Sequence, residues 1–336
     1  MPSTEEERAE WLETVREEII EPERRIVDPH HHMWIESGLP RYLLEDLWRD
    51  TGSGHNIEKT VFMECGAEYR KGGLPHEEPV GETEFVTRAA QESRNSGNAE
   101  IAGIVAHTDL TQDLGIVRSV CAMHEEVADG LFRGIRHGGA HDAEKVARWG
   151  DATSDPGLYE RKNFREGVRE LGRLGLSYDT WHYHIQNQAY ADLARSIPDT
   201  LMVLDHFGTP LGVGPYADKR TEIFQNWKQD IRDIAACENV VAKIGGLAMP
   251  PNGFGWHRDE KPPSSDEVVR MQRDYYLHTI DSFGPDRCMF ESNFPVDKLS
   301  LSYHVYWNAM KKIAAEFSES EKDAMFYGTA TRVYRL

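Results

Sequence analysis

The sequence has 336 residues, a formal net charge of −19 and an isoelectric point near 5.2. A field of that sign repels phosphate, so the composition argues against a nucleic acid or an anionic membrane as the partner. No apolar run reaches the roughly 18 to 20 residues of a membrane span, and the N-terminus lacks the basic-then-apolar order of a secretory signal, so we expect a cytoplasmic protein.

The four cysteines lie far apart in the sequence and form no CxxC pair; they are Cys65, Cys121, Cys237 and Cys288. This pattern does not support a disulfide framework or a thiolate metal site. We expect reduced and mostly buried thiols.

The first segment, residues 3–21, is predicted to be a surface helix. Ser3 with Glu6 has the spacing of a capping box, and an apolar stripe precedes Pro22, formed by Trp11, Leu12, Val15, Ile19 and Ile20. We expect residues 1–25 to be an extension of a domain that spans residues 26–336. Such an appended helix packs on the core or on a partner subunit, so it is compatible with a homodimer.

The next segment, residues 26–34, carries three consecutive histidines behind a short apolar start. In a strand, Asp28, His30 and His32 point to one face and His31 to the other. Two neutral imidazoles at this spacing can hold one divalent cation or one substrate oxygen. A purification tag is the weaker interpretation, because the triplet lies inside the chain.

Eight short strand-like segments recur along the chain, at 26–32, 60–66, 101–107, 131–137, 175–181, 201–206, 240–245 and 287–293. Helix-patterned stretches separate them, which predicts parallel strands, and eight such units close into a (β/α)8 TIM barrel of α/β class. The rival is an open doubly wound sheet, but no GxGxxG follows the first strand. Long connections at 67–81, 138–160 and 248–265 are expected as loops at the C-terminal face.

Polar residues gather at the C-terminal tips of these segments, where active sites of such barrels lie. They are His32, Glu64, His107, His137, Trp181, His206 and Asn293. The sequence therefore predicts an active site at this face.

Three segments together resemble the amidohydrolase superfamily, in its amidohydrolase-2 branch that includes lactonases. They are residues 28–34 (DPHHHMW), 204–208 (LDHFG) and 290–296 (FESNFPV), and the resemblance extends from about residue 26 to Leu336. It implies a hydrolase of esters, lactones or amides, or more rarely a decarboxylase. By position, His30 and His32 match the first-strand HxH, and His206 matches the histidine of the later strand.

Asn293 departs from the branch, which usually has an aspartate there that takes a proton from the attacking water. An asparagine amide has no accessible basic form. Glu291 lies two residues earlier, on the same strand face, and is the first candidate for the general base. Asp297 is the second, and a structural role for Glu291 as a partner of an arginine or lysine stays open.

The three histidines His30, His32 and His206 could bind a single divalent metal ion, Zn²⁺ or Mn²⁺, with an open position for water or a carbonyl. The alternative is metal-free: the imidazoles hold the carbonyl directly while a carboxylate activates water. Both alternatives leave His206 in the catalytic set with Glu291, Asp297 and Asn293.

Several side chains near the strand tips are candidates for contact with an anionic small-molecule substrate. Arg133 and Arg136 could bind a carboxylate bidentately, although ion pairs with the many acidic residues are an equally good interpretation. Trp181, His184 and Tyr69 could grip a planar acid. Lys243 is a lone lysine in an apolar strand, and we expect Glu291 or Glu64 as its partner.

The preferred function is a hydrolase that opens a lactone or related ester of a small carboxylated substrate. A metal-dependent decarboxylase of the same branch is the first alternative. A ligand-binding barrel that lost its aspartate at Asn293 is the second.

Overall fold

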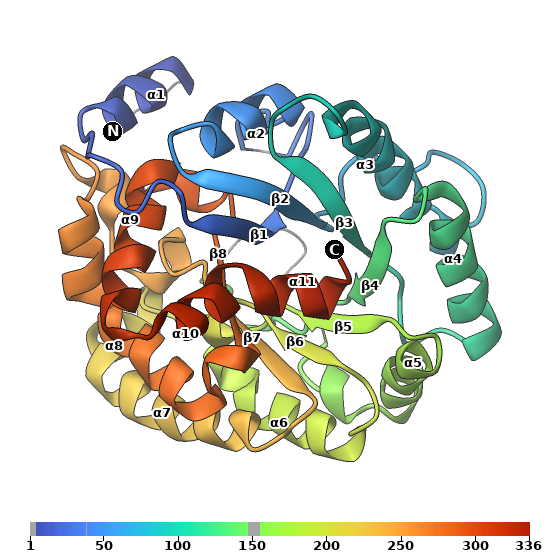
Figure 1. The fold of residues 1–336 in the computed structure, drawn as a ribbon. Coiled ribbons are helices and arrows are strands. Elements are labelled where there is room, and N and C mark those ends of the chain that lie inside the picture. The colour runs from blue at the N-terminus through green and yellow to red at the C-terminus, as the bar shows by residue number, and fades with distance from the viewer. Residues whose placement is uncertain (1–4, 38, 147–154) are drawn as a thin grey trace.

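The computed structural model describes residues 5–37, 39–146 and 155–336, and its centre is a parallel β-barrel (Figure 1). Eight strands pair in chain order: β1 (Arg25–His31), β2 (Asn56–Met63), β3 (Glu100–Ala106), β4 (Phe132–Arg136), β5 (Ser177–Thr180), β6 (Met202–Leu204), β7 (Val240–Gly245) and β8 (Cys288–Glu291). The backbone N–H of His32 donates to the carbonyl of Phe294 over 2.8 Å, which joins β1 to the segment after β8. The predicted TIM barrel is confirmed.

Helices surround the strands, as the alternating pattern predicts: α2 (Leu44–Thr51), α3 (Val80–Ser93), α4 (Leu114–Val127), α5 (Lys162–Arg173), α6 (Asn187–Ser196), α7 (Arg220–Ala235), α8 (Ser265–Phe283), α9 (Tyr303–Ile313) and α10 (Glu319–Asp323). Outward strand residues such as Phe62, Ile104 and Ile135 belong to the apolar core that these helices share. This outer layer leaves the inward strand residues free to form a separate interior.

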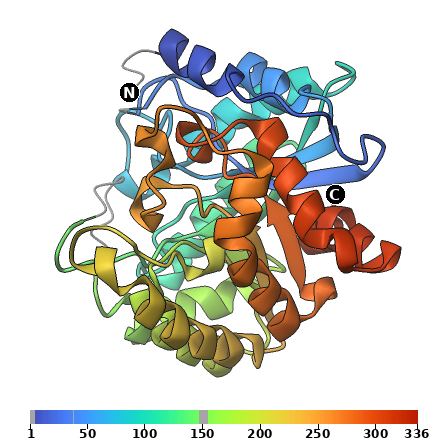
Figure 2. The ribbon, with the colours of Figure 1, turned by 90° about the vertical axis from the view of Figure 1, so that its left-hand side faces the viewer.

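The amino-terminal end of the barrel is closed by α11 (Thr329–Tyr334), which crosses the opening in Figure 1 and lies at one end of the barrel in Figure 2. Ala330, Val333 and Tyr334 of this helix pack on an apolar interior formed by Val27, Val61, Met63, Val105, Val203, Val241 and Met289. The opposite end carries the loops that follow the strands.

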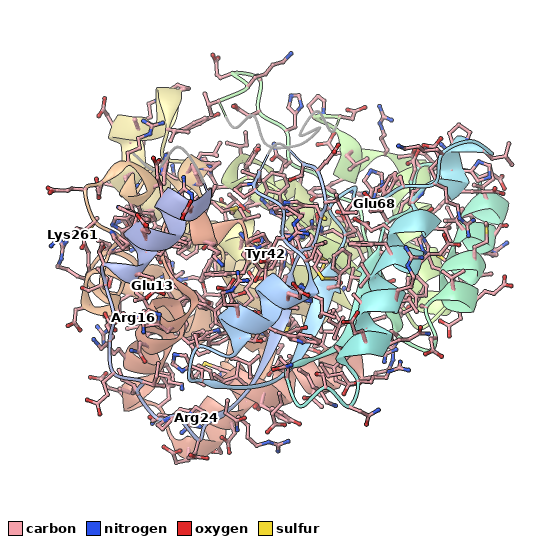
Figure 3. All side chains as sticks on the ribbon, turned by 90° about the horizontal axis from the view of Figure 1, so that it is seen from above. Glu13, Arg16, Arg24, Tyr42, Glu68 and Lys261 are labelled. Atoms are coloured by element: carbon pink, nitrogen blue, oxygen red, sulfur yellow. The ribbon has the colours of Figure 1, made fainter. Side chains whose placement is uncertain are left out.

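The predicted helix over residues 3–21 is wrong in its length, because α1 ends at Glu13 (Glu5–Glu13). Ser3 of the predicted capping box lies outside the described residues. Beyond α1, the segment with Arg16 and Arg24 runs along the barrel to β1 (Figure 3). Asn308 of α9 holds it through its side chain, which accepts from the N–H of Ile20 at 3.0 Å and donates to the carbonyl of Glu18 at 2.9 Å. These contacts replace helical hydrogen bonds.

The four cysteines are unpaired thiols, and three of them are buried, with Cys65 half-buried. This agrees with the prediction. Among the described residues, no helix combines the length and the apolar character that a membrane span needs.

Candidate active site

Four strands deliver polar side chains to one buried point at the carboxyl end of the barrel. His30 and His32 come from β1 and its end, Arg136 ends β4, His206 follows β6, and Glu291 ends β8. His30 and Glu291 are fully buried, and the other three expose at most 7% of their surface. The prediction that the strand tips bring these residues together agrees with the structure.

His30 lies at the centre of this cluster, and its two ring nitrogens face different neighbours. Its Nε2 lies 3.2 Å from His32 Nε2 and 3.4 Å from Arg136 Nη1. Its Nδ1 lies 2.7 Å from Glu291 Oε2. Each edge of the ring therefore faces a group that can exchange a proton or share a cation.

The proton on His32 is located by its hydrogen bond. His32 Nδ1 lies 2.8 Å from the carbonyl oxygen of Met63, which can only accept, so Nδ1 carries the proton. Burial lowers the pKa of His32 and of His30 well below the usual value, so the rings are neutral at pH 7. The Nε2 lone pair of His32 consequently points at His30.

Glu291 joins the first and sixth strands through two imidazoles. Its Oε1 accepts from His206 Nδ1 at 2.7 Å and from the His206 N–H at 3.3 Å, while Oε2 faces His30 without hydrogen-bond alignment. Burial raises the pKa of Glu291 to about 8 and lowers that of His206 to about 3. A carboxylate bonded to histidine fixes the ring orientation and tautomer.

Two buried cations and Asp205 complete the cluster. Arg136 Nη1 donates to Asp205 Oδ2 at 3.4 Å, and Arg136 Nε donates to Glu64 Oε1 at 2.8 Å. Lys243 lies 3.3 Å from Asp205 Oδ1 and 3.1 Å from Asp179 Oδ2. The expected partners of Lys243, Glu291 or Glu64, are therefore corrected to Asp179 and Asp205.

Asp28 does not share the face of His30 and His32, contrary to the alternation expected from the sequence. The pairing of β1 with β2 shifts register between Asp28 and His31, across Pro29, which has no N–H. Asp28 instead accepts from the Ser292 N–H at 2.9 Å and from the Tyr303 hydroxyl at 2.8 Å. It ties β1 to the segment after β8 and to α9.

The backbone at the site is strained. His206, Phe207 and Asn293 have φ values of 54°, 59° and 55°, in the left-handed region that side chains with a Cβ rarely adopt. Each such residue costs of the order of 1 to 3 kcal/mol and is typical of functional sites. His206 and Asn293 are thus held in place by the surrounding fold.

Asn293 and Asp297 bind each other at the edge of the cluster. Asn293 Nδ2 donates to Asp297 Oδ1 at 2.9 Å, and the N–H of Ala248 donates to Asp297 Oδ2 at 3.0 Å. Burial raises the pKa of Asp297 to about 8. Both carboxylate oxygens are occupied, whereas Glu291 contacts two of the histidines directly, so the geometry favours Glu291 of the two predicted bases.

The two predicted substrate arginines lie in different places. The prediction that Arg133 lies at the substrate site is corrected. Its side chain donates to the backbone carbonyls of Gly130 and Ala102 and lies beside Leu336, at the end of β4 away from the cluster. Arg136 ends β4, whereas Arg133 lies three residues earlier in the strand and is therefore nearer the amino-terminal floor of the barrel. Arg136 lies in the cluster, where three of its nitrogens already donate to protein groups.

The predicted aromatic contacts lie around the loops of this face. Trp181 Nε1 donates to Thr209 Oγ1 at 3.0 Å, and His184 Nδ1 accepts from the N–H of Leu211 at 3.2 Å. Both partners follow His206 within five residues. Tyr69 is half-buried, and burial with the nearby charges of Glu82 and Glu64 raises its pKa. Their roles in substrate binding stay predictions.

The donor set fits a divalent metal ion. Among the described residues, His30, His206 and Glu291 offer ligand atoms that all lie within 4.8 Å of one another. The 3.2 Å between the Nε2 atoms of His30 and His32 matches the roughly 3.3 Å expected between two nitrogens on tetrahedral zinc. In the part of the chain that the structure describes, no group donates a hydrogen bond to Glu291 Oε2 or to Asp205 Oδ1, although both oxygens are buried, so each is available to a cation.

Sequence reasoning did not assign Asp205, Asp179 or Tyr334 to the site. Asp205 could have been found, because it is a charged residue directly after an apolar strand and beside His206. Asp179 lies within β5, one residue before its end. Tyr334 lies on the last helix and carries no local signal, since only the packing of α11 under the barrel brings it near the other two.

Comparison with known proteins gives a consistent result over nearly the whole chain. Residues 27–336 match the family model described as amidohydrolase. An uncharacterized protein, y4mH, of Sinorhizobium fredii is 31% identical over 333 residues, covering 93% of this chain and 98% of its own length. An L-fucono-1,5-lactonase of Burkholderia multivorans is 26% identical, covering 92% of this chain and 96% of its own length.

A solved structure shows the same fold. The crystal structure of an amidohydrolase from Burkholderia multivorans with bound zinc superposes with a TM-score of 0.69 at 23% identity. The match covers 93% of this chain and 100% of the other.

Proposed function

Because the chain belongs to the amidohydrolase family, we propose that it is a hydrolase that opens a lactone or a related ester of a small carboxylated substrate. The lactonase named above is similar over almost its entire length, which supports this reaction class.

One observation carries the proposal: Glu291 joins His30 and His206 through its two oxygens, 2.7 Å from a ring nitrogen of each. A carboxylate that orients two imidazoles is suited to moving a proton between water and a leaving group. The cluster lies at the carboxyl ends of the strands, where barrel enzymes carry their chemistry.

In the proposed reaction, water attacks the lactone carbonyl carbon and gives a proton to the pair formed by His206 and Glu291. The carbon–oxygen bond of the ring then breaks, and the same pair returns the proton to the leaving oxygen, which yields a hydroxy acid. The Arg136 guanidinium, 3.4 Å from His30 Nε2, favours the negative charge that develops on the carbonyl oxygen. His32 Nε2 carries a lone pair and is therefore suited to a cation rather than to that oxygen.

A divalent metal ion held by His30 and His206, with Glu291 or His32, would polarise the carbonyl and acidify the water when bound. The zinc in the related crystal structure supports this choice of cofactor. The metal-free arrangement, in which imidazoles hold the carbonyl directly, is the alternative that the test below separates.

A decarboxylase is the second candidate, and one observation favours it. Glu291 Oε1 already accepts from His206 Nδ1, and Oε2 lies 2.7 Å from His30 Nδ1, so both oxygens are directed at imidazoles rather than at a position open to water. A decarboxylation needs a cation to hold the substrate and a proton donor for the product, but no base for water. Arg136 and Lys243 would supply the charge.

The test is a panel of sugar-derived and aromatic lactones compared with aromatic carboxylic acids, with and without chelator. Lactone opening releases acid, which a pH indicator follows, whereas decarboxylation releases CO2. We expect acid release from at least one lactone. CO2 release without acid release would support the decarboxylase, and binding without turnover would support a ligand-binding barrel.

A matched pair of variants links any activity to the cluster. Glu291→Gln should lower kcat about 10²- to 10⁴-fold, because an amide cannot take up a proton and return it. Glu82→Gln removes another buried carboxylate, one that binds the N–H groups of Cys65 and Ala67, and should leave kcat unchanged. Equal losses in both variants would contradict the assignment of Glu291.

A further inference from the structure

A buried polar connection runs through the apolar floor of the barrel. Tyr334 of α11 belongs to the apolar interior, yet its hydroxyl donates to Asp179 Oδ2. Asp179 also accepts from Ser177 Oγ at 2.7 Å and from Lys243 Nζ at 3.1 Å. Tyr334, Asp179 and Lys243 are each fully buried.

Tyr334 contacts both charged members of this connection. Its hydroxyl binds the carboxylate, and its ring centroid lies 5.2 Å from the Lys243 ammonium, within the range of a cation–π contact. One tyrosine therefore determines where Asp179 and Lys243 can lie.

On its other side, Lys243 contacts the active-site cluster. The ammonium lies 3.4 Å from His30 Nδ1 and 3.3 Å from Asp205 Oδ1. His30 Nδ1 is the same nitrogen that faces Glu291 Oε2 at 2.7 Å. A shift of Lys243 would consequently change the charge that this edge of His30 meets.

Stability alone does not account for such a connection. Replacing a buried ion pair by apolar residues of similar volume is often neutral or stabilising. The floor around the connection is apolar, with Val203 on β6 and Val241 on β7 among its members. A lysine and an aspartate in this setting cost desolvation that an all-apolar floor would avoid.

We propose that Tyr334 is a positioning residue for the active site, which acts from the opposite end of the barrel through Asp179 and Lys243. Its hydroxyl holds Asp179, and Asp179 with the tyrosine ring holds Lys243. Lys243 then holds Asp205 and the Nδ1 edge of His30. The kinetic part of the test rests on the proposed function, and the spectroscopic part does not.

The experiment compares Tyr334→Phe with Tyr190→Phe in the full-length protein. Tyr190 of α6 is a buried tyrosine whose hydroxyl has no hydrogen-bond partner among the described residues, so it controls for loss of a buried hydroxyl. For Tyr334→Phe we expect kcat to fall about tenfold or more with KM within about twofold, because a charge-assisted hydrogen bond is lost but the substrate contacts stay. Tyr190→Phe should leave both constants unchanged.

The second readout is the ring ¹⁵N spectrum of histidine-labelled protein, with His30 assigned from the His30→Gln variant. Tyr334→Phe should shift the His30 signals, and Tyr190→Phe should not. If Tyr334→Phe does not fold, Asp179→Asn replaces it, with the same expected shift. Unmoved His30 signals overturn the proposal, whatever the kinetics, whereas a wild-type protein that opens no lactone overturns only the proposed reaction.

Discussion

Asn293 shows how a single residue departs from a family pattern without loss of polar pairing. Its amide donates to Asp297 Oδ1 at 2.9 Å, in place of the carboxylate that the resemblance leads one to expect. An asparagine here can pair with a buried Asp297 in either charge state of that carboxyl, whereas two carboxylates would repel each other.

The first prediction concerns Asn293→Asp, which puts a second carboxyl against Asp297. Asparagine and aspartate tolerate the left-handed backbone at this position similarly, so backbone strain is not a factor. At pH 8.5 we expect a loss of about 3 kcal/mol in unfolding free energy. Burial already raises the pKa of Asp297 to about 8, and the new neighbour raises it further.

The direction of the pKa shift determines how this loss of stability depends on pH. A carboxyl with a raised folded-state pKa holds its proton in the folded protein but not in the unfolded chain between about pH 4 and 8, so the cost appears as pH rises. Melting temperatures of the variant and wild type should converge toward pH 5. The double variant Asn293→Asp with Asp297→Asn restores one amide and one carboxyl and should recover most of the loss. A deficit that is independent of pH would contradict this explanation.

The side-chain contacts of the site were only partly predictable from sequence. The HxH pair, the late histidine and Glu291 each lie on a predicted strand or directly after one, so their convergence followed from the barrel itself. The face of Asp28 was not predictable, because the register shift across Pro29 breaks the alternation. The sequence left Arg133 and Arg136 as equal candidates, and the pairing of β3 with β4, which also shifts register, makes simple alternation a poor guide between them.

At the scale of elements, the strands were more predictable than the N-terminal helix. Eight buried strands must satisfy both the barrel interior and the helix layer, so short β-prone segments recur at regular intervals between helix-patterned stretches. Residues 14–24 have an apolar stripe as well, but a neighbouring helix supplies their hydrogen bonds. Tertiary contact thus overrides local propensity in this segment.

The second prediction tests whether contact with α9 holds residues 14–24 in place, and it uses the variant Asn308→Ala. The Asn308 side chain is fully buried and holds the Ile20 N–H and the Glu18 carbonyl. Its loss leaves two partly buried backbone groups without their side-chain partner, at a cost of about 1 to 2 kcal/mol in unfolding free energy. Asn226→Ala, at an exposed position of α7, should change stability by less than about 0.5 kcal/mol.

Denaturant unfolding measures both variants, and hydrogen exchange locates the effect. Amides of residues 14–24 should exchange faster in Asn308→Ala than in the wild type, whereas those of the strands should not. Equal stability of the two variants would show that the segment is held by its apolar stripe rather than by Asn308.

At the scale of the whole molecule, the buried cluster carries an excess of acidic groups. It holds two cations, Arg136 and Lys243, and four carboxyl groups. Glu64, Asp179 and Asp205 pair with the two cations, whereas Glu291 lies against His30 and His206. A divalent cation would balance that excess, and burial makes the balance energetically important.

The third prediction is that divalent metal stabilises the protein. Zn²⁺ or Mn²⁺ at about a hundredfold above its dissociation constant should add about 2.7 kcal/mol to the unfolding free energy, and a chelator should remove that gain. The gain should shrink in Glu291→Gln and stay in Glu82→Gln. Differential scanning fluorimetry measures it, and a melting temperature insensitive to every divalent ion would favour the metal-free arrangement.

The fourth prediction concerns the net charge of −19. Repulsion between like charges destabilises the compact state, and salt screens it, so raising sodium chloride from about 0.05 to 0.5 M should raise the melting temperature by roughly 2–5 °C. Chloride is preferred over sulfate, because sulfate also strengthens apolar burial. A melting temperature that falls with sodium chloride would mean that favourable ion pairs outweigh the repulsion.

The enclosure of the site has a consequence for the timing of turnover. His30 and Glu291 have no solvent-exposed surface, so a substrate reaches them only after the surrounding chain moves aside. If chemistry occurs at this cluster, each cycle includes an opening step, and friction with the solvent slows such a motion. Added glycerol or sucrose should then reduce turnover in proportion to viscosity, which a reaction limited by bond breaking would not show.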